Sequence, residues 1–147
     1  MLTGELLSQN LPYLHLNDKV YQALQLMNDN QVAHLPIVDG EKYVGIISED
    51  DLLLVDNEHA ELNTLQQSFG NAAVKNSDHF LKAIQLAGEN GLSVVPIVDE
   101  ENDLEGAVTY NDLLRHASEF MSLKEPGGLI VLEVESNQYS FNEISKL

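Results

Sequence analysis

Two short motifs in this chain pair a hydroxyl with a carboxylate at the same spacing, Ser48-x-x-Asp51 and Thr109-x-x-Asp112. Each motif begins where a strand-like run gives way to a helix-like run, so the aspartate falls in the first helical turn. Exposed backbone N–H groups and the positive end of the helix dipole lie there. A carboxylate in that place can accept hydrogen bonds from both hydroxyls of a ribose, as acidic residues do in dinucleotide sites. The simpler interpretation is a helix N-cap with a favourable charge, and both interpretations stay open.

The two motifs belong to a longer internal repeat. Leu35–Asp39 and Val95–Asp99 share the order Pro-Ile-Val-Asp, sixty positions apart. Gly45–Leu52 and Gly106–Leu113 correspond at sixty-one positions, because one extra residue stands in the turn that precedes the second segment. An insertion in a surface turn leaves the flanking elements in place. Self-similarity at a fixed period indicates a duplicated supersecondary unit.

Hydrophobic spacing predicts the order strand, helix, strand, strand, helix in each copy. In the first copy we expect strands at 13–16, 35–38 and 43–48, and helices at 20–30 and 49–54. In the second copy we expect strands at 72–75, 94–98 and 104–109, a helix that carries Phe80, Leu81, Ile84 and Leu86, and a helix at 111–121. A linker with a short helix is expected at 56–68. The candidate helix caps are Thr3, Asn17 or Asp18, and Ser77 or Asp78.

Composition bounds the class of protein. The chain has 147 residues, of which 44% are hydrophobic, so it suits one compact domain rather than a disordered chain. It has 24 acidic and 7 basic residues and a formal net charge of −17, which disfavours nucleic acid and anionic membranes as partners. Cysteine is absent, and no apolar run approaches the length of a membrane span. We expect a cytoplasmic protein.

An apolar-Pro-Ile-Val-Asp strand followed by a turn and Gly-apolar-apolar-Ser/Thr-x-x-Asp-Leu resembles a CBS (cystathionine β-synthase-type) motif. Two such motifs in tandem resemble a CBS pair, or Bateman module. We therefore expect CBS motif 1 at 1–60, CBS motif 2 at 61–122, and at 123–147 a linker plus the start of a truncated ACT-like domain. That combination is similar to bacterial acetoin-utilisation-type regulatory proteins.

The resemblance implies an α/β (α+β) fold in which two β-α-β-β-α repeats pack about a pseudo-two-fold axis. It also implies two clefts between the repeats that take adenosine derivatives such as AMP, ADP, ATP or S-adenosylmethionine. Modules of this family pair into homodimers and act as regulators rather than enzymes. The resemblance implies that the protein requires no cofactor, and we expect an adenosine-containing ligand as its partner.

The second copy is expected to hold the better nucleotide site, since Tyr110 and Asn111 stand where the first copy has acidic residues. Arg115 lies on the same helix face as Asp112 and could contact a phosphate, although a solvated ion pair with Asp112 or Glu119 is an equal alternative. The residues expected at this site are Thr109, Asp112, Val95, Pro96, Arg115 and Lys75.

The first copy is expected to be weaker or empty, because Glu49 and Asp50 beside Asp51 repel phosphate. His34 could stack on a base, and the alternative is a partly buried structural histidine. Pro36 removes a strand N–H, which leaves a neighbouring peptide group for an adenine edge. The residues expected at this site are Ser48, Asp51, Leu35, Pro36, His34 and His15.

No catalytic or metal motif accompanies these sites. The sequence lacks a Gly-x-Ser-x-Gly elbow, a phosphate-binding Gly-x-x-x-x-Gly-Lys loop and a dinucleotide Gly-x-Gly-x-x-Gly. Glu49–Asp51 could attract Mg²⁺, but the spacing of a calcium loop is missing and we expect no metal. The leading hypothesis is a non-enzymatic sensor of an adenosine derivative, and its rival is a ligand-free CBS scaffold for dimerisation or docking.

Overall fold

The computed structural model of the chain describes residues 2–7 and 11–124. It divides into two compact units, Met1–Leu113 and Leu114–Leu147. The first unit contains both copies of the repeat, and of the second unit the structure describes the remainder of the last helix. From residue 125 on, the expected linker and ACT-like start lie outside the described residues.

Each copy has the predicted order of strand, helix, strand, strand and helix. The first copy comprises β1 (Leu14–His15), α1 (Val20–Asn30), β2 (His34–Asp39), β3 (Lys42–Ser48) and α2 (Glu49–Leu53). The second comprises β4 (Val74–Lys75), α3 (Phe80–Asn90), β5 (Val94–Val98), β6 (Leu104–Thr109) and α4 (Tyr110–Lys124). Short 3-10 helices, η1 (Thr3–Leu6) and η2 (Leu62–Ser68), precede the two copies.

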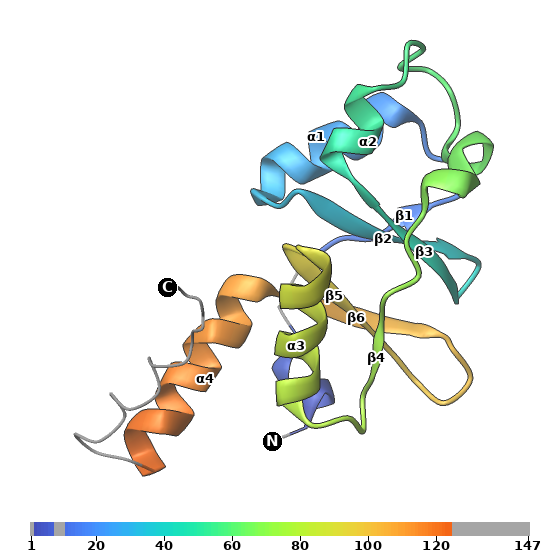
Figure 1. Cartoon of the computed structure of the whole chain (residues 1–147). Helices are drawn as coiled ribbons and strands as arrows, with labels where there is room; N and C mark the ends of the chain where they lie inside the picture. The colour runs from blue at the N-terminus through green and yellow to red at the C-terminus, as the bar shows by residue number, and fades with distance from the viewer. Residues whose placement is uncertain (1, 8–10, 125–147) are drawn as a thin grey trace. The chain divides into compact units, whose positions relative to one another are not determined.

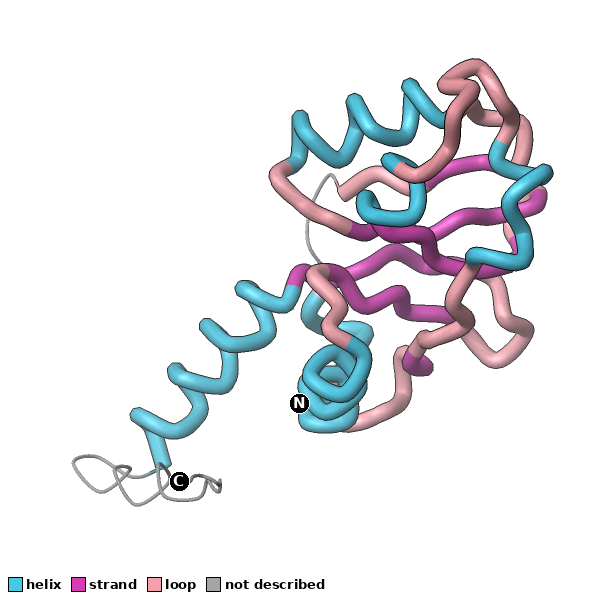
Figure 2. The backbone as a smooth tube through the Cα atoms, turned by 45° about the horizontal axis from the view of Figure 1, so that its top comes forward, coloured by secondary structure: helices cyan, strands magenta, loops and turns pink. Residues whose placement is uncertain are grey.

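Two three-stranded sheets of the same topology form the centre of the first unit. In each sheet the first strand is parallel to the second, and the second is antiparallel to the third. The register shifts at the same place in both, between Ile37 and Val38 and between Ile97 and Val98. Figures 1 and 2 show the strands between α1 and α2 on one side and α3 on the other. The duplication therefore extends to the details of strand pairing.

The core repeats with the same period as the sequence. Val20, Ala23 and Met27 of α1 are buried, and so are the residues sixty positions later, Phe80, Ala83 and Ala87 of α3. The predicted helical stripe is confirmed, although Phe80 fills the place of a smaller valine. Burial of the valine, methionine and phenylalanine side chains of this set supplies about 1.5–3 kcal/mol each.

The predicted caps at Asn17 or Asp18 and at Ser77 or Asp78 are wrong. The N-caps are Lys19 for α1 and His79 for α3. Asp18 and Asp78 instead accept hydrogen bonds from the backbone N–H three residues earlier, each at 2.8 Å. A short carboxylate side chain can close a local turn in this way, so the helix begins one residue later.

Each repeat is crossed by the segment that precedes the other one. Thr3 is buried, and its Oγ1 lies 2.8 Å from the carbonyl oxygens of Lys75 and Asp78 in the second copy. Thr3 is therefore not the cap of η1, a position that Leu2 holds. In the reciprocal contact, Gly70 exchanges two backbone hydrogen bonds with Ile46, at 2.8 and 2.9 Å. The two repeats are thus tied together by exchanged segments as well as by their sheets.

The glycine that opens each downstream motif is explained by these crossings. A Cβ at Gly45 would lie 2.7 Å from the Cβ of Phe69, and a Cβ at Gly106 would lie 2.9 Å from Cδ2 of Leu7. Phe69 and Leu7 belong to the two crossing segments, so both glycines leave room for the chain that packs across them.

Candidate functional site

Two cavities in the first unit contain the Ser/Thr-x-x-Asp motifs. The larger cavity has a volume of about 490 Å³ and the smaller cavity about 260 Å³. The larger is lined by Leu11, Asn30, Gln31, Val32, Ser93, Thr109, Tyr110, Asn111 and Asp112. The smaller is lined by His34, Ile46, Ser48, Asp51, Ser68, Gly70, Asn71, Ala72, Asn90 and Leu92. Each cavity draws its lining from both repeats.

The motif hydroxyls cap the helices that carry the motif aspartates. Ser48 Oγ accepts a hydrogen bond from Asp51 N, and Thr109 Oγ1 accepts one from Asp112 N, each at 3.1 Å. The N-cap interpretation is therefore confirmed for both copies, and it fixes the start of the helix at the cavity wall. The cap uses the backbone N–H of the aspartate, and the carboxylate takes no part in it.

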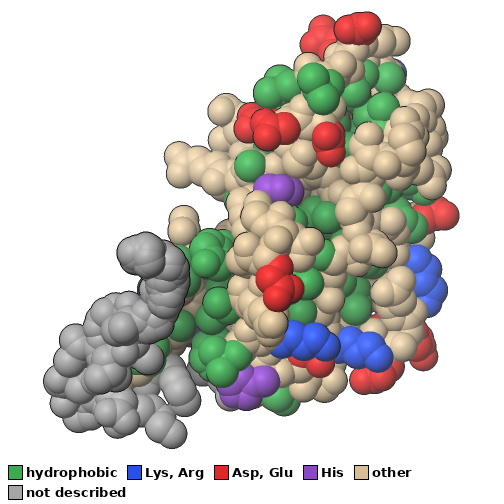
Figure 3. Space-filling view, viewed as in Figure 1, with side chains coloured by type: hydrophobic (Ala, Val, Ile, Leu, Met, Phe, Trp, Pro, Cys, Tyr) green, Lys and Arg blue, Asp and Glu red, His purple; other side chains and the backbone are tan. Residues whose placement is uncertain are grey.

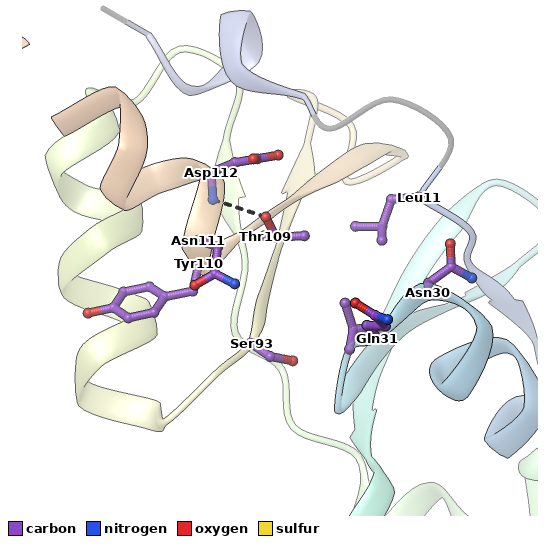
Figure 4. Close-up of a pocket in the computed structure, with 9 residues that line it drawn as sticks. Leu11, Asn30, Gln31, Ser93, Thr109, Tyr110, Asn111 and Asp112 are labelled. Carbon is purple, nitrogen blue, oxygen red and sulfur yellow. Dashed lines mark hydrogen bonds between the residues drawn. The ribbon is translucent and has the colours of Figure 1, made fainter. Parts of the chain in front are cut away.

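The opposite wall of the larger cavity comes from the end of α1. Asn30 ends that helix with its side-chain amide donating to Leu26 O at 2.8 Å, and Gln31 follows in the left-handed conformation, with φ of 57°. Figure 4 shows Gln31 and Leu11 across the cavity from Thr109, while the Tyr110 ring points away from them. Asn90 and Gly91 at the end of α3 are built in the same way. These helix ends were not predicted as site residues.

A recurring signal for those residues does exist in the sequence. Asn30 and Asn90 stand sixty positions apart, and Val32 corresponds to Leu92. The repeat alone therefore marks them as equivalent. What it does not reveal is that each lies opposite the motif of the other copy, because that pairing depends on how the two sheets pack.

The structure brings together five of the twelve predicted site residues at the two cavities. Thr109 and Asp112 line the larger one. Ser48, Asp51 and His34 line the smaller one.

The other predicted residues lie elsewhere in the described structure. The side chains of Leu35, Pro36, Val95 and Pro96 are buried in their strands and line neither cavity. His15 is exposed at the end of β1, beside the Tyr13 ring at 5.3 Å. Lys75 is exposed at the end of β4, and Arg115 is an exposed residue of α4 beyond the first unit.

Basic side chains of the described chain are largely engaged in ion pairs. Lys42 pairs with Asp103 at 2.9 Å, and Lys75 lies 3.6 Å from Glu100. In the face shown in Figure 3, most of the visible Lys and Arg side chains gather at the lower right, where acidic side chains lie beside them. No Lys or Arg occurs among the described residues that line the two cavities.

Asp112 is the one charged side chain among the described residues that line the larger cavity. The smaller cavity holds Asp51 and His34. Burial lowers the pKa of His34, whereas the nearby carboxylates of Asp50 and Asp51 raise it. Within residues 2–7 and 11–124, no group of three or more acidic or histidine side chains is placed to hold a metal ion.

The chain is a tandem α/β repeat protein, because its two three-stranded sheets have the same topology. It has two candidate ligand sites, since each of two cavities between the repeats contains an aspartate in the first turn of a capped helix. The model of the CBS domain family matches residues 4–58 and 72–119. The chain therefore belongs to the CBS domain family and carries two copies of that domain. None of the helices in the described part combines the length and the apolar character needed to cross a bilayer.

Solved structures support the same fold. A CBS domain pair/ACT domain protein from Thermotoga maritima matches with a TM-score of 0.73 and 23% identity, over 82% of this chain and 99% of that one. The acetoin utilization protein AcuB from Vibrio cholerae matches with a TM-score of 0.69 and 20% identity, over 85% and 96%. CBSX2, solved in complex with AMP, matches with a TM-score of 0.65 and 26% identity, over 81% and 97%.

Among curated relatives, the inosine-5'-monophosphate dehydrogenase of Methanocaldococcus jannaschii is 25% identical over 132 residues, which is 89% of this chain. The chain spans only 26% of the length of that enzyme. The match is thus to a part of a larger protein, and it concerns the repeat rather than the whole enzyme.

Proposed function

We propose that this chain is a regulatory, non-enzymatic CBS pair that binds an adenosine derivative in the larger cavity. The observation that carries the proposal is the position of Asp112, in the first turn of α4 at the wall of a cavity of about 490 Å³. In this proposal the carboxylate accepts from the ribose hydroxyls. Thr109 holds the helix start through its cap. The likeness to CBSX2, which was solved with AMP, supports the choice of ligand class.

The charge of the cavity bears on which adenosine derivative binds. Its described lining contains a carboxylate and no cation, and the sequence has a net charge of −17. Each additional phosphate would be brought into a negative field without a basic partner. Adenosine and the positively charged S-adenosylmethionine are therefore favoured over AMP, and AMP over ATP. Lys75 and Arg115 remain candidate phosphate contacts on the sequence argument alone.

The proposed mechanism is a shift between arrangements of the two repeats. The larger cavity is closed by Asn30 and Gln31 on one side and by Thr109 and Asp112 on the other, so a ligand contacts both repeats. A ligand that contacts both sides favours the arrangement in which they are correctly spaced. The differential affinity for the two arrangements then limits how strongly the signal can be transmitted.

The rival proposal is a scaffold without a ligand, and two exposed leucines favour it. Leu53 and Leu54 at the end of α2 are 64% and 81% exposed, and apolar side chains of this size are usually covered by a partner when they cluster. A homodimer through this helix belongs to both proposals. The motif boundaries 1–60, 61–122 and 123–147 and a cytoplasmic location also remain proposals.

A thermal-shift series separates the two functions. We expect adenosine and S-adenosylmethionine to raise the melting temperature most, AMP less and ATP least, because a ligand that binds only the native state stabilises it by mass action. Guanosine is the matched control for the base. If no adenosine compound shifts the melting temperature at about 1 mM, a concentration far above a useful dissociation constant, the result supports the ligand-free scaffold. A larger shift with ATP than with adenosine would contradict the charge argument.

A further inference from the structure

One side-chain contact joins the two cavities directly. His34, the first residue of β2, lines the smaller cavity, and Ser93, just before β5, lines the larger one. The Nδ1 atom of His34 lies 2.9 Å from Ser93 Oγ and accepts a hydrogen bond from Ser93 N at 3.2 Å. Ser93 Oγ in turn accepts from Ala33 N at 3.0 Å. The contact thus fixes both the hydroxyl and the backbone amide of a residue in the wall of the larger cavity.

The hydrogen bonds define the protonation state of the imidazole. Because Ser93 N–H donates to Nδ1, that nitrogen carries no proton, and the neutral ring holds its proton on Nε2. Protonation would place an N–H against the Ser93 N–H and leave this amide without its acceptor. The charged groups that act on the ring are Asp50 and Asp51, both in α2. The other polar neighbours in the smaller cavity include Asn71 and Asn90, which do not titrate.

The link exists in one direction only. The residues sixty positions from Ser93 and His34 are Ala33 and Val94, and neither has a side chain that could form these hydrogen bonds. The smaller cavity therefore has no corresponding polar wall residue held by the other repeat. This asymmetry separates the contact from the structure that both repeats share.

We propose that His34 is a positioning residue for the larger cavity: as a neutral acceptor it holds Ser93 in the cavity wall, and as an imidazolium it releases it. A change in the charge of His34 at the smaller cavity thereby changes the position of Ser93 in the wall of the larger cavity. The effect on affinity rests on the proposed function, since it requires an adenosine ligand, whereas the effect on Ser93 does not. Acidification is expected to weaken binding, because the neutral ring is the form that supports the wall.

The ligand-free chain tests the contact itself by NMR between about pH 7.5 and 5. We expect the His34 ring and the Ser93 amide to titrate with one midpoint, which lies below the ordinary value of 6.5 because the pKa is lowered. His34→Asn keeps an acceptor near the position of Nδ1 but cannot titrate, so the Ser93 amide should lose its pH dependence. His59→Asn is the matched control, because His59 is exposed and packs against Tyr21. A Ser93 amide that ignores pH in the wild type, or still titrates in His34→Asn, would overturn the proposal.

Calorimetry with adenosine tests the consequence for binding. Loss of one or two hydrogen bonds to a cavity wall predicts that the wild type binds about tenfold more weakly at low pH. His34→Asn should bind equally at both pH values, and His34→Val, which copies the residue at position 94, should bind weakly at both. The same pH dependence in His34→Asn as in the wild type would contradict the proposal. If adenosine binds to no variant, the proposed function fails, and the NMR result still decides whether His34 positions Ser93.

Discussion

The two cavities share their backbone construction and differ in their side chains. Both have a motif hydroxyl that caps a helix at 3.1 Å and an asparagine that ends a helix of the other repeat. At the larger cavity the motif threonine is followed by Tyr110 and Asn111, whereas at the smaller cavity the motif serine is followed by two acidic residues, Glu49 and Asp50. Duplication thus preserved the backbone elements that line each cavity, and the residues within the motif determine the charge of the cavity.

The largest expected effect distinguishes the two cores. Phe80→Ala should lower the free energy of unfolding by about 3–5 kcal/mol, because it leaves a cavity where a fully buried ring was. Val20→Ala, at the equivalent position of the first repeat, removes fewer atoms and should cost about 2 kcal/mol. Urea unfolding measures both, and equal losses would show that the two cores do not differ in the way described.

The next effect distinguishes the two cavities as binding sites. Asp112→Asn should weaken adenosine binding tenfold or more, since a hydrogen bond to a charged group contributes about 1.5–3 kcal/mol. Asp51→Asn should change it by less than about threefold, because the favoured ligand site is the larger cavity. Calorimetry of both variants decides. Equal losses would contradict the ranking of the cavities.

The helix caps should respond alike where the cavities do not. Ser48→Ala and Thr109→Ala each remove a cap of the same length, and each should cost about 1 kcal/mol of stability. Chemical denaturation gives the two values. A clear difference would contradict the equivalence of the two caps.

The smallest effect concerns pH. Because burial lowers the pKa of His34 in the folded state, the unfolded chain takes up the proton first as the pH falls below 6.5. The wild type should therefore lose stability relative to His34→Asn between about pH 7 and the lowered pKa, and the difference should be constant above pH 7. Parallel denaturation curves at several pH values check the sign. A wild type that gains stability on acidification relative to the variant would contradict it.

The sequence predicted the order of the elements because that order depends on local spacing. The repeated strand-Pro and Ser/Thr-x-x-Asp signals sit in register, and every strand and helix of both copies was found where they indicated. The caps were mispredicted because a carboxylate such as Asp18 can serve either a helix start or a preceding turn, and the tertiary structure selects between them.

The site was predicted only in part, for a related reason. Asp51 and Asp112 were recognised from their local chemistry. Gln31 and Ser93 were not, because they reach a cavity only through the packing of one repeat on the other. Val95 was expected at the nucleotide site, yet it is fully buried in β5 and lines neither of the two cavities.

The exchanged segments have a consequence for how such a molecule can be divided or inherited. Thr3 is seated in the second half of the chain, and Gly70 is hydrogen-bonded into the first. If one half were expressed alone, its leading segment would have no second repeat to cross, and its own repeat would lack the segment that normally crosses it. A single-copy ancestor would satisfy both contacts by exchanging this segment with a second copy. Fusion of the two genes would then have brought a dimer contact into a single chain.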